Sequence, residues 1–494
     1  MPKRENRHAL KWLSISAALF IVCLGAFSFH FYEKKHMTNT QRSITAVLSG
    51  KLSLPMSPEN ISSIPLYHIH YNLWNTILLA HGEPGVAQLL ETTGDKVFRF
   101  EILPDTRFSN GREMNSEDIL FSVNRLLSRQ SEGHFNVKGL IEKITATSKM
   151  GFEITLKEHA ASFLFLLSIP EMGIVPREAC ESNGDIKSLD ITSGAYSVLG
   201  QPETNSMVLA KNKYFKRNIP ESPDQVKIIF KTGADKLFEA ANTEHPDFIE
   251  IYESNGSAVF RKIKNIPEYA YKATRPSYSV FLVSNTKNLS LEERLAISEL
   301  VHDNLPEHYP LTPEIEKPSY EILPPKTFGS LGLQEYPAIT KKHGNLPTKI
   351  RLACFDKNSV LVKAIAEILT QSNTQIELVD LAPGVDYDIK LLGQGMNADF
   401  PEIEFHLNMV STWAYIDVKE SEKETIVKAI HSNDKKERAH LIQKIGQSLL
   451  DDGRVIPLIV RSYVHVYRKN TLNIDRVNDY DGDISFGLMK AGGL

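Results

Sequence analysis

Cysteine is scarce in this chain of 494 residues, which contains only three. They stand far apart, at Cys23, Cys180 and Cys354. Three scattered thiols form neither the framework of a small disulfide-rich domain nor a thiolate metal site. The sequence leaves open one bridge between Cys180 and Cys354, but it favours free, buried thiols.

A surplus of positive charge is also missing. The formal net charge is −4 and the isoelectric point is about 6.5. Surfaces that bind nucleic acids are strongly basic, so we expect no nucleic-acid partner. The sequence also lacks G-x-S-x-G, H-E-x-x-H and G-x-x-x-x-G-K-[ST] motifs. We therefore expect neither enzymatic activity nor a bound cofactor.

Long apolar runs are absent after the first 29 residues, since the stretch 163–169 is too short to cross a bilayer. The one long run, residues 12–29, follows four basic residues. As a helix it would be about 27 Å long, close to the hydrocarbon thickness. Residues 1–36 are therefore predicted to be a signal peptide or, as we favour, a retained membrane anchor. Either one places the rest of the chain in the periplasm or at the extracytoplasmic face of the membrane.

The region from Glu83 to Leu127 encodes several elements locally. Apolar and polar residues alternate over 97–102, which predicts a strand with one buried face after a Gly94-Asp95 turn. A second turn is predicted at Asn110-Gly111. Asn115-Ser116 can then cap a helix whose apolar residues recur at helical spacing.

This ordered series resembles the signature region of the family 5 solute-binding proteins, the extracytoplasmic peptide and nickel receptors of ABC importers. The matching residues are Pro84, Ala87, Asp95, Phe98, Phe100, Leu103, Phe108, Asn110, Gly111, Asp118, Ile119, Phe121 and Arg125. Further matches follow in the family's order at 192–196, 226–230, 246–249, 278–285, 293–297, 323–325, 385–393, 434–438 and 455–458.

The resemblance implies an α/β, type II periplasmic-binding-protein-like fold, with two lobes, a hinge and an extra inserted domain, preceded by one N-terminal apolar helix. The chain is long enough for several cores. We expect a discontinuous domain I at 37–75, 185–275 and 465–494. The inserted domain II would cover 76–184, and domain III would cover 276–464.

In function, the resemblance implies a receptor that captures oligopeptides or similar small solutes between its lobes. It would deliver them to the permease subunits of an ABC importer. The missing phosphate loop implies that the ATPase is a separate subunit, and a nickel-receptor role stays open. The alternative is a membrane-anchored protein with the receptor fold, used for signalling or scaffolding rather than uptake.

The ligand-binding residues are predicted from one loop. Peptide receptors of this family carry an aspartate four residues after a glycine, where it pairs with the peptide's α-ammonium. Gly393 to Pro401 keeps this spacing, but Asn397 stands at the aspartate position and Gln394 at the usual tryptophan. A neutral hydrogen bond is weaker than a charged one, so a free amino terminus should bind less well. Asp399 could replace the aspartate through a register shift, or the loop residues could simply form a turn.

Two other pairs are candidates. Trp413 and Tyr415 could form an aromatic wall for the ligand or belong to the core. His68 and His70 would share a face if they lie on a strand, as metal ligands can. A third nearby ligand is missing from the sequence around them, so we expect packing rather than a metal site.

Overall fold

The computed structural model describes residues 42–59, 61, 64–129, 137–251, 256–336, 346–410, 416–476 and 484–492. The chain divides into two units, Met1–Arg42 and Ser43–Leu494, and the elements below all belong to the second. The predicted apolar helix of residues 1–36 lies outside the described residues. No helix within the described ranges is long and apolar enough to cross a membrane.

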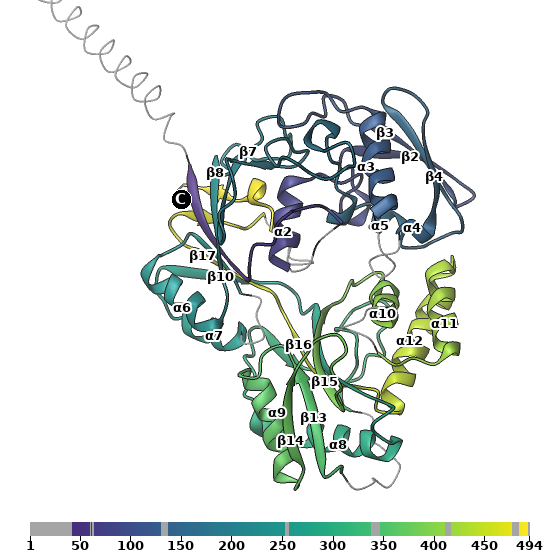
Figure 1. The fold of residues 1–494 in the computed structure, drawn as a ribbon, viewed down its shortest axis with the longest axis vertical. Coiled ribbons are helices and arrows are strands. Elements are labelled where there is room, and N and C mark those ends of the chain that lie inside the picture. The colour runs from purple at the N-terminus through teal and green to yellow at the C-terminus, as the bar shows by residue number, and fades with distance from the viewer. Residues whose placement is uncertain are drawn as a thin grey trace, which may run out of the picture. The chain divides into compact units, whose positions relative to one another are not determined.

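A sheet of seven strands is built from both ends and the middle of this unit (Figure 1). Its strands, in spatial order, are β10 (Tyr269–Ala273), β17 (Val464–Arg468), β9 (Phe248–Ile251), β1 (Ser43–Ser49), β8 (Gln225–Lys231), β7 (Ser206–Lys211) and β6 (Tyr196–Val198). β1 runs parallel to β8 and β9. Its alternate residues enter two cores: Ala46 and Leu48 on one face, and Val47 on the other with helices α6 (Ala234–Thr243) and α7 (Gly256–Ile263).

A four-stranded antiparallel sheet contains the predicted local elements. Its order is β2 (Ala87–Thr93), β3 (Val97–Ile102), β5 (Gly151–Leu156) and β4 (Ile141–Ala146). The strand predicted at 97–102 is confirmed, and its residues Phe98, Phe100 and Ile102 are buried beneath helix α3 (Ser116–Arg129). The predicted cap is confirmed as well, because Asn115 Oδ1 accepts a hydrogen bond from Glu117 N at 3.0 Å.

A six-stranded mixed sheet lies between two helical layers (Figure 1). Its order is β12 (Glu316–Pro318), β16 (Val455–Arg461), β11 (Tyr278–Ser284), β15 (Ile389–Gly395), β13 (Lys349–Cys354) and β14 (Gln375–Asp380). Val280 and Leu282 of β11 pack against α8 (Leu291–His308) and α9 (Val360–Gln371). Phe281 and Val283 face α11 (Glu420–His431) and α12 (Lys435–Asp451).

The remaining elements connect these sheets. They are α2 (Ile64–Leu73), α4 (Val137–Leu140), α5 (Phe163–Leu166), α10 (Pro401–Val410), β18 (Leu472–Asn473), β19 (Lys490–Ala491) and the 3₁₀ turns η1 (Ala80–Gly82), η2 (Pro170–Met172), η3 (Arg177–Ala179) and η4 (Phe486–Leu488). The neighbouring strands β16 and β17 belong to different sheets.

The histidines His68 and His70 lie on helix α2, so the strand assumed for a shared metal-binding face is wrong. His68 Nε2 contacts the Glu250 carboxylate at 2.5 Å, and His70 lies against the ring of Trp74 with centroids 4.8 Å apart. Burial lowers the pKa of His70 to about 3, so this ring is neutral at physiological pH. Both side chains are buried in the interior.

Candidate functional site

Two segments of the chain cross side by side between the seven-stranded and six-stranded sheets (Figure 1). Residues 274–277 join β10 to β11, and residues 462–463 join β16 to β17. Thr274 N donates a hydrogen bond to Tyr463 O at 3.0 Å, and Ser277 N donates one to Arg461 O at 3.2 Å. Two short hydrogen-bonded segments between two packed bodies form an arrangement about which such bodies can turn.

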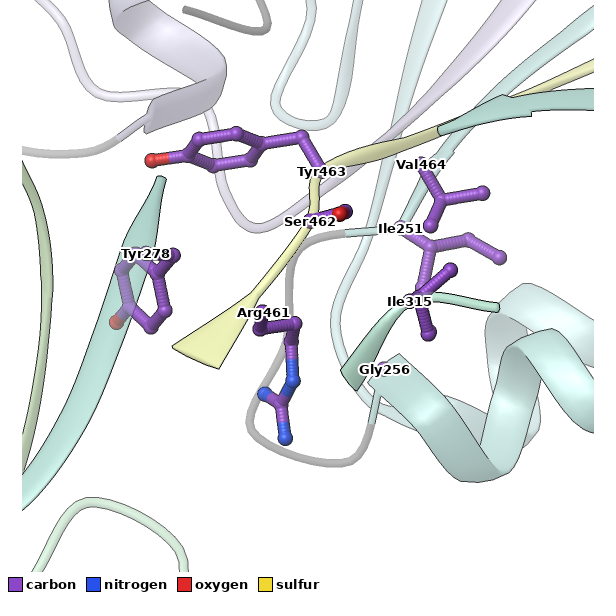
Figure 2. A pocket seen from close by; sticks show the side chains of 8 residues that line it. All are labelled: Ile251, Gly256, Tyr278, Ile315, Arg461, Ser462, Tyr463 and Val464. Atoms are coloured by element: carbon purple, nitrogen blue, oxygen red, sulfur yellow. The ribbon is translucent and has the colours of Figure 1, made fainter. Parts of the chain in front are cut away.

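A small pocket lies at these crossings (Figure 2). Figure 2 shows Tyr278 and Tyr463 on one side of Arg461, and the apolar side chains of Ile251, Ile315 and Val464 on the other. The cavity volume is about 10 Å³. That is room for about one water molecule. The crossing is therefore packed in this conformation and offers no space for a solute.

A buried ion pair fixes one side of the crossing. Arg461 donates to the Glu316 carboxylate from Nη2 at 2.7 Å and from Nε at 3.0 Å. The carboxylate also accepts hydrogen bonds from Ser257 Oγ, from Tyr309 Oη at 2.9 Å and from Thr312 N at 3.0 Å. Burial alone would raise the pKa of Glu316, but the charge of Arg461 and these hydrogen bonds hold it below its usual value. Ser257 lies in the first turn of α7, which packs on the seven-stranded sheet, so this cluster links the two larger sheets.

Two glycines of β15 lie beneath the tyrosines of the crossing. A Cβ atom at Gly393 would lie 2.3 Å from Tyr278 Oη, and one at Gly395 would lie 2.9 Å from Tyr463 Oη. The bare backbone is therefore required for the two rings to lie there, with centroids 6.0 Å apart. Gln394 stands between the glycines and is half-buried, and strand geometry directs its side chain to the opposite face.

The predicted loop places Asn397 as a turn-forming residue. Its Oδ1 accepts hydrogen bonds from Asp399 N and Phe400 N, both at 2.9 Å, just before helix α10 begins at Pro401. Asn397 is buried, whereas Asp399 is exposed. A side-chain oxygen that bonds backbone groups two and three residues ahead is a typical Asx turn.

Arg438 of α12 holds this loop in place. Its Nη2 donates to Asp399 O at 3.0 Å, and its guanidinium lies 4.9 Å from the ring centre of Phe400 and 4.2 Å from that of Phe328. The helix start is fixed by Asp434, whose Oδ1 accepts from Lys436 N at 2.8 Å. The sequence segment 434–438, which matched the family by pattern alone, thus supports the candidate loop.

Glu402 follows the loop in the first turn of α10. Its side chain is fully buried, and neither carboxylate oxygen has a hydrogen-bond partner among the described residues. The nearest cation, Arg438 Nε, is 3.7 Å away, too far for a hydrogen bond. Burial raises the pKa of Glu402 to about 7, and the charge of Arg438 only partly opposes this.

We expect Glu402→Gln to stabilise the protein in alkaline solution. Between pH 4.5, the ordinary pKa, and about 7, the folded state holds a proton that the unfolded state has released. Stability therefore falls as the pH rises through this window, and the substitution removes the fall. At pH 8 the free energy of unfolding should rise by about 2–3 kcal/mol. Chemical denaturation at pH 4.5 and pH 8 measures this.

The exposed Glu424→Gln on α11 is the matched control and should leave the pH profile unchanged. An identical pH dependence in Glu402→Gln and the parent protein would show that this carboxyl group is ionised normally.

The other candidates are placed as follows. Trp413 and Tyr415 lie outside the described residues, so their predicted role stays a prediction. Cys180 and Cys354 are both free and buried, as favoured from the sequence. Within the described ranges, no three His, Cys, Asp or Glu side chains are grouped so that they could hold a metal ion.

Sequence reasoning missed Arg461, Glu316 and Arg438 as residues of the site. Arg461 and Glu316 are 145 positions apart, and no local pattern links them. One signal was present: Gly393 and Gly395 leave one strand face bare, which indicates that large side chains cover it.

Comparison with known proteins finds a family that is similar to the central part of the chain. Residues 82–302 match the model described as "Bacterial extracellular solute-binding proteins, family 5 Middle". Over these residues the chain is similar to family 5 of these proteins. The resemblance stated from the sequence is thereby confirmed. Proteins of family 5 are extracellular and bind solutes.

A curated relative is the periplasmic oligopeptide-binding protein OppA of Salmonella typhimurium. It is 26% identical over 196 residues, which is 35% of this chain. The match spans only 36% of the length of that relative.

Solved structures show the fold over nearly the whole chain. A dipeptide-binding protein of Pseudoalteromonas sp. SM9913 in complex with Met-Leu matches with a TM-score of 0.78 at 12% identity, over 91% of this chain and 100% of that one. NikA of Brucella suis in complex with Fe(III)-EDTA matches with a TM-score of 0.77 at 16% identity, over 90% and 99%. At these identities the likeness shows the fold alone, and it confirms the predicted mixed α/β class.

Proposed function

We propose that this chain is an extracytoplasmic receptor that holds an oligopeptide or similar solute between two lobes. It passes the solute to the permease of an ABC importer whose ATPase is a separate subunit. The observation that carries the proposal is the pair of bonded crossings between the two larger sheets. The proposed domain I contains the seven-stranded sheet, domain II the four-stranded sheet and domain III the six-stranded sheet.

Lobe closure explains how such a receptor works without covalent chemistry. Two packed bodies that turn about adjacent strands can enclose a solute and replace its lost water with backbone and polar groups. A permease can then distinguish the closed form from the open one, so a bound solute becomes a signal for delivery. The solute leaves unchanged, and the proposal therefore assigns no enzymatic activity to the chain.

Asn397 limits which solutes we expect this receptor to bind. Its Oδ1 is already occupied by two backbone N–H groups, and it carries no charge. A peptide's ammonium group therefore finds no carboxylate at the position that the family pattern gives it. We propose that this receptor does not depend on a free amino terminus. We also propose that Gln394, near the end of β15, and Asp399, in the loop that follows, contribute polar contacts.

Asn397→Asp should increase the affinity for peptides with a free amino terminus about tenfold, because a charged hydrogen bond is stronger by about 1–1.5 kcal/mol. A carboxylate oxygen can accept the same two backbone hydrogen bonds, so the turn should survive. Calorimetric titration with a tripeptide and its N-acetylated form measures the effect, and only the free form should gain.

Asn358→Asp, an exposed substitution on the six-stranded-sheet part of the chain, controls for the added charge. Equal gains for the free and acetylated peptides, or no gain, would show that residue 397 does not face the solute.

The function itself is tested on the full-length chain. Mass spectrometry of small molecules released from the purified protein should find intact solutes that rebind. Conversion of a solute into a product would overturn the proposal. A chain that neither carries nor binds any solute would instead support a signalling or scaffolding role, which the neutral, turn-forming Asn397 also fits.

The location is proposed from residues 1–36, which would tether the protein to the cytoplasmic membrane or be cleaved on export. Membrane fractionation followed by determination of the mature amino terminus separates the two cases. Recovery of the protein from the cytoplasm would contradict both.

A further inference from the structure

A second pocket, distinct from the crossing, lies where the four-stranded-sheet part meets α10 and α11. Its volume is about 360 Å³, within the range of small-molecule sites. It is lined by Gly139, Leu140, Lys157, Glu158, Ser162, Leu166, Ile403, His406, Val427, Ile430 and His431. Five of these residues, Leu140, Leu166, Ile403, Val427 and Ile430, have aliphatic side chains, so the pocket can take an apolar group.

Two polar side chains inside the pocket have an atom with no hydrogen-bond partner among the described residues. Ser162 is 1% exposed, and its Oγ has none. The Nδ1 atom of His406 is also buried and without one. A buried polar atom left unsatisfied destabilises the folded state, so a bound group that reaches these atoms would recover that loss.

Opposite charges stand side by side at the pocket's edge. Lys157 and Glu158 are neighbours in sequence, and both are exposed. The Nδ1 atom of His431 lies 3.9 Å from the Glu158 carboxylate. A pair of opposite charges beside an apolar cavity matches a zwitterion with an apolar side chain, whose carboxylate and ammonium would face Lys157 and Glu158.

We propose that this pocket binds a free α-amino acid with a large branched or aromatic side chain. The side chain enters the cavity between Leu166 and Ile403, and the charged end stays at the edge near Lys157 and Glu158. The pocket lies between the two proposed lobes, but its lining shares no residue with that of the pocket at the crossings.

Because the pocket lies between two parts of the chain, ligand binding there affects how these parts are arranged. The same two parts of the chain touch beside it: Ala161 N donates to Ile430 O at 3.2 Å, and His431 Nδ1 contacts His159 O at 2.5 Å. A ligand that contacts both walls binds only while they are together. Its binding therefore favours the arrangement in which these parts touch.

The test is calorimetric titration of the full-length chain with L-phenylalanine and L-leucine. Both should bind, whereas L-alanine, phenethylamine and phenylacetate should bind at least tenfold more weakly, because each lacks the apolar group or one charge. Val427→Trp should reduce the affinity for L-phenylalanine at least tenfold by filling the pocket from α11.

The matched control is Val360→Trp. Val360 is another exposed helical valine, 37% exposed against 44% for Val427, and it does not line the pocket. It should leave binding unchanged. Glu158→Gln should lower the affinity for L-phenylalanine but not the affinity for phenylacetate.

Three outcomes would overturn the proposal. One is the absence of binding by both amino acids. Another is equal binding to Val427→Trp, which would place the amino acid elsewhere, for instance between the larger sheets. The third is equal affinity for phenylacetate and L-phenylalanine, which would show that the charged pair does not contribute to binding.

Discussion

Arg461→Met is expected to lower the free energy of unfolding by about 3–5 kcal/mol, because it leaves the Glu316 carboxylate buried without its cation. The Glu316 side chain is 0% exposed and that of Arg461 is 11% exposed, so water cannot replace the lost charge. A loss of this size is a large share of the stability of a typical domain. Urea denaturation at neutral pH measures it.

The pH dependence separates this cause from a simple packing defect. In the parent protein the pKa of Glu316 is lowered, so its contribution is present above the ordinary pKa and is lost as the pH falls through the lowered value. Without Arg461, burial dominates and raises that pKa. The variant should therefore regain stability as the pH falls toward 5, opposite to the parent protein.

Lys264→Met is the control at the same contact. Lys264, the residue after α7, pairs with Glu314 in the segment before β12 at 2.6 Å, but both side chains reach solvent. Exposed pairs contribute little, so this variant should unfold almost as the parent does. Equal losses in Lys264→Met and Arg461→Met would show that the buried pair has no special role.

Local elements could be predicted because their signals are local. The Gly94-Asp95 turn has φ values of 57° and 53°, and Gly111 has a φ of 90°, as short turns require. The strand at 97–102 and the helix from Ser116 follow from periodicity and capping, which need only neighbouring residues. These features also carried the family resemblance.

The candidate site could be predicted only in part. The sequence marked the Gly393–Pro401 loop but not what holds it, since Arg438 reaches Asp399 O across 39 positions. His68 and His70 would share a face only on a strand, and their two-residue spacing alone cannot distinguish a buried helix from a strand. The glycines at 393 and 395 showed that a face was covered, but not that Tyr278 and Tyr463 cover it.

Arg125→Met tests whether a residue of the family signature serves the fold rather than a ligand. Its Nη1 and Nη2 donate to the two oxygens of Glu59 at 2.7 and 2.9 Å, and Nε donates to Gly184 O at 2.7 Å. Both charged side chains are almost fully buried. We expect a loss of about 3–5 kcal/mol in the free energy of unfolding, because Glu59 would remain buried and charged.

The double substitution Arg125→Met with Glu59→Leu identifies the cause. Replacing both members of a buried pair by apolar residues removes the stranded charge, so the double variant should be more stable than Arg125→Met alone. The control is Arg99→Met on β3, which removes exposed ion pairs with Glu91 and Glu153. It should change the unfolding midpoint little.

Arg125 links α3, above the four-stranded sheet, to the segment that follows β1 of the seven-stranded sheet. If Arg125→Met loses stability but keeps its solute affinity once folded, the signature arginine joins two parts of one lobe. A loss of affinity without a loss of stability would contradict this and place the arginine at the solute.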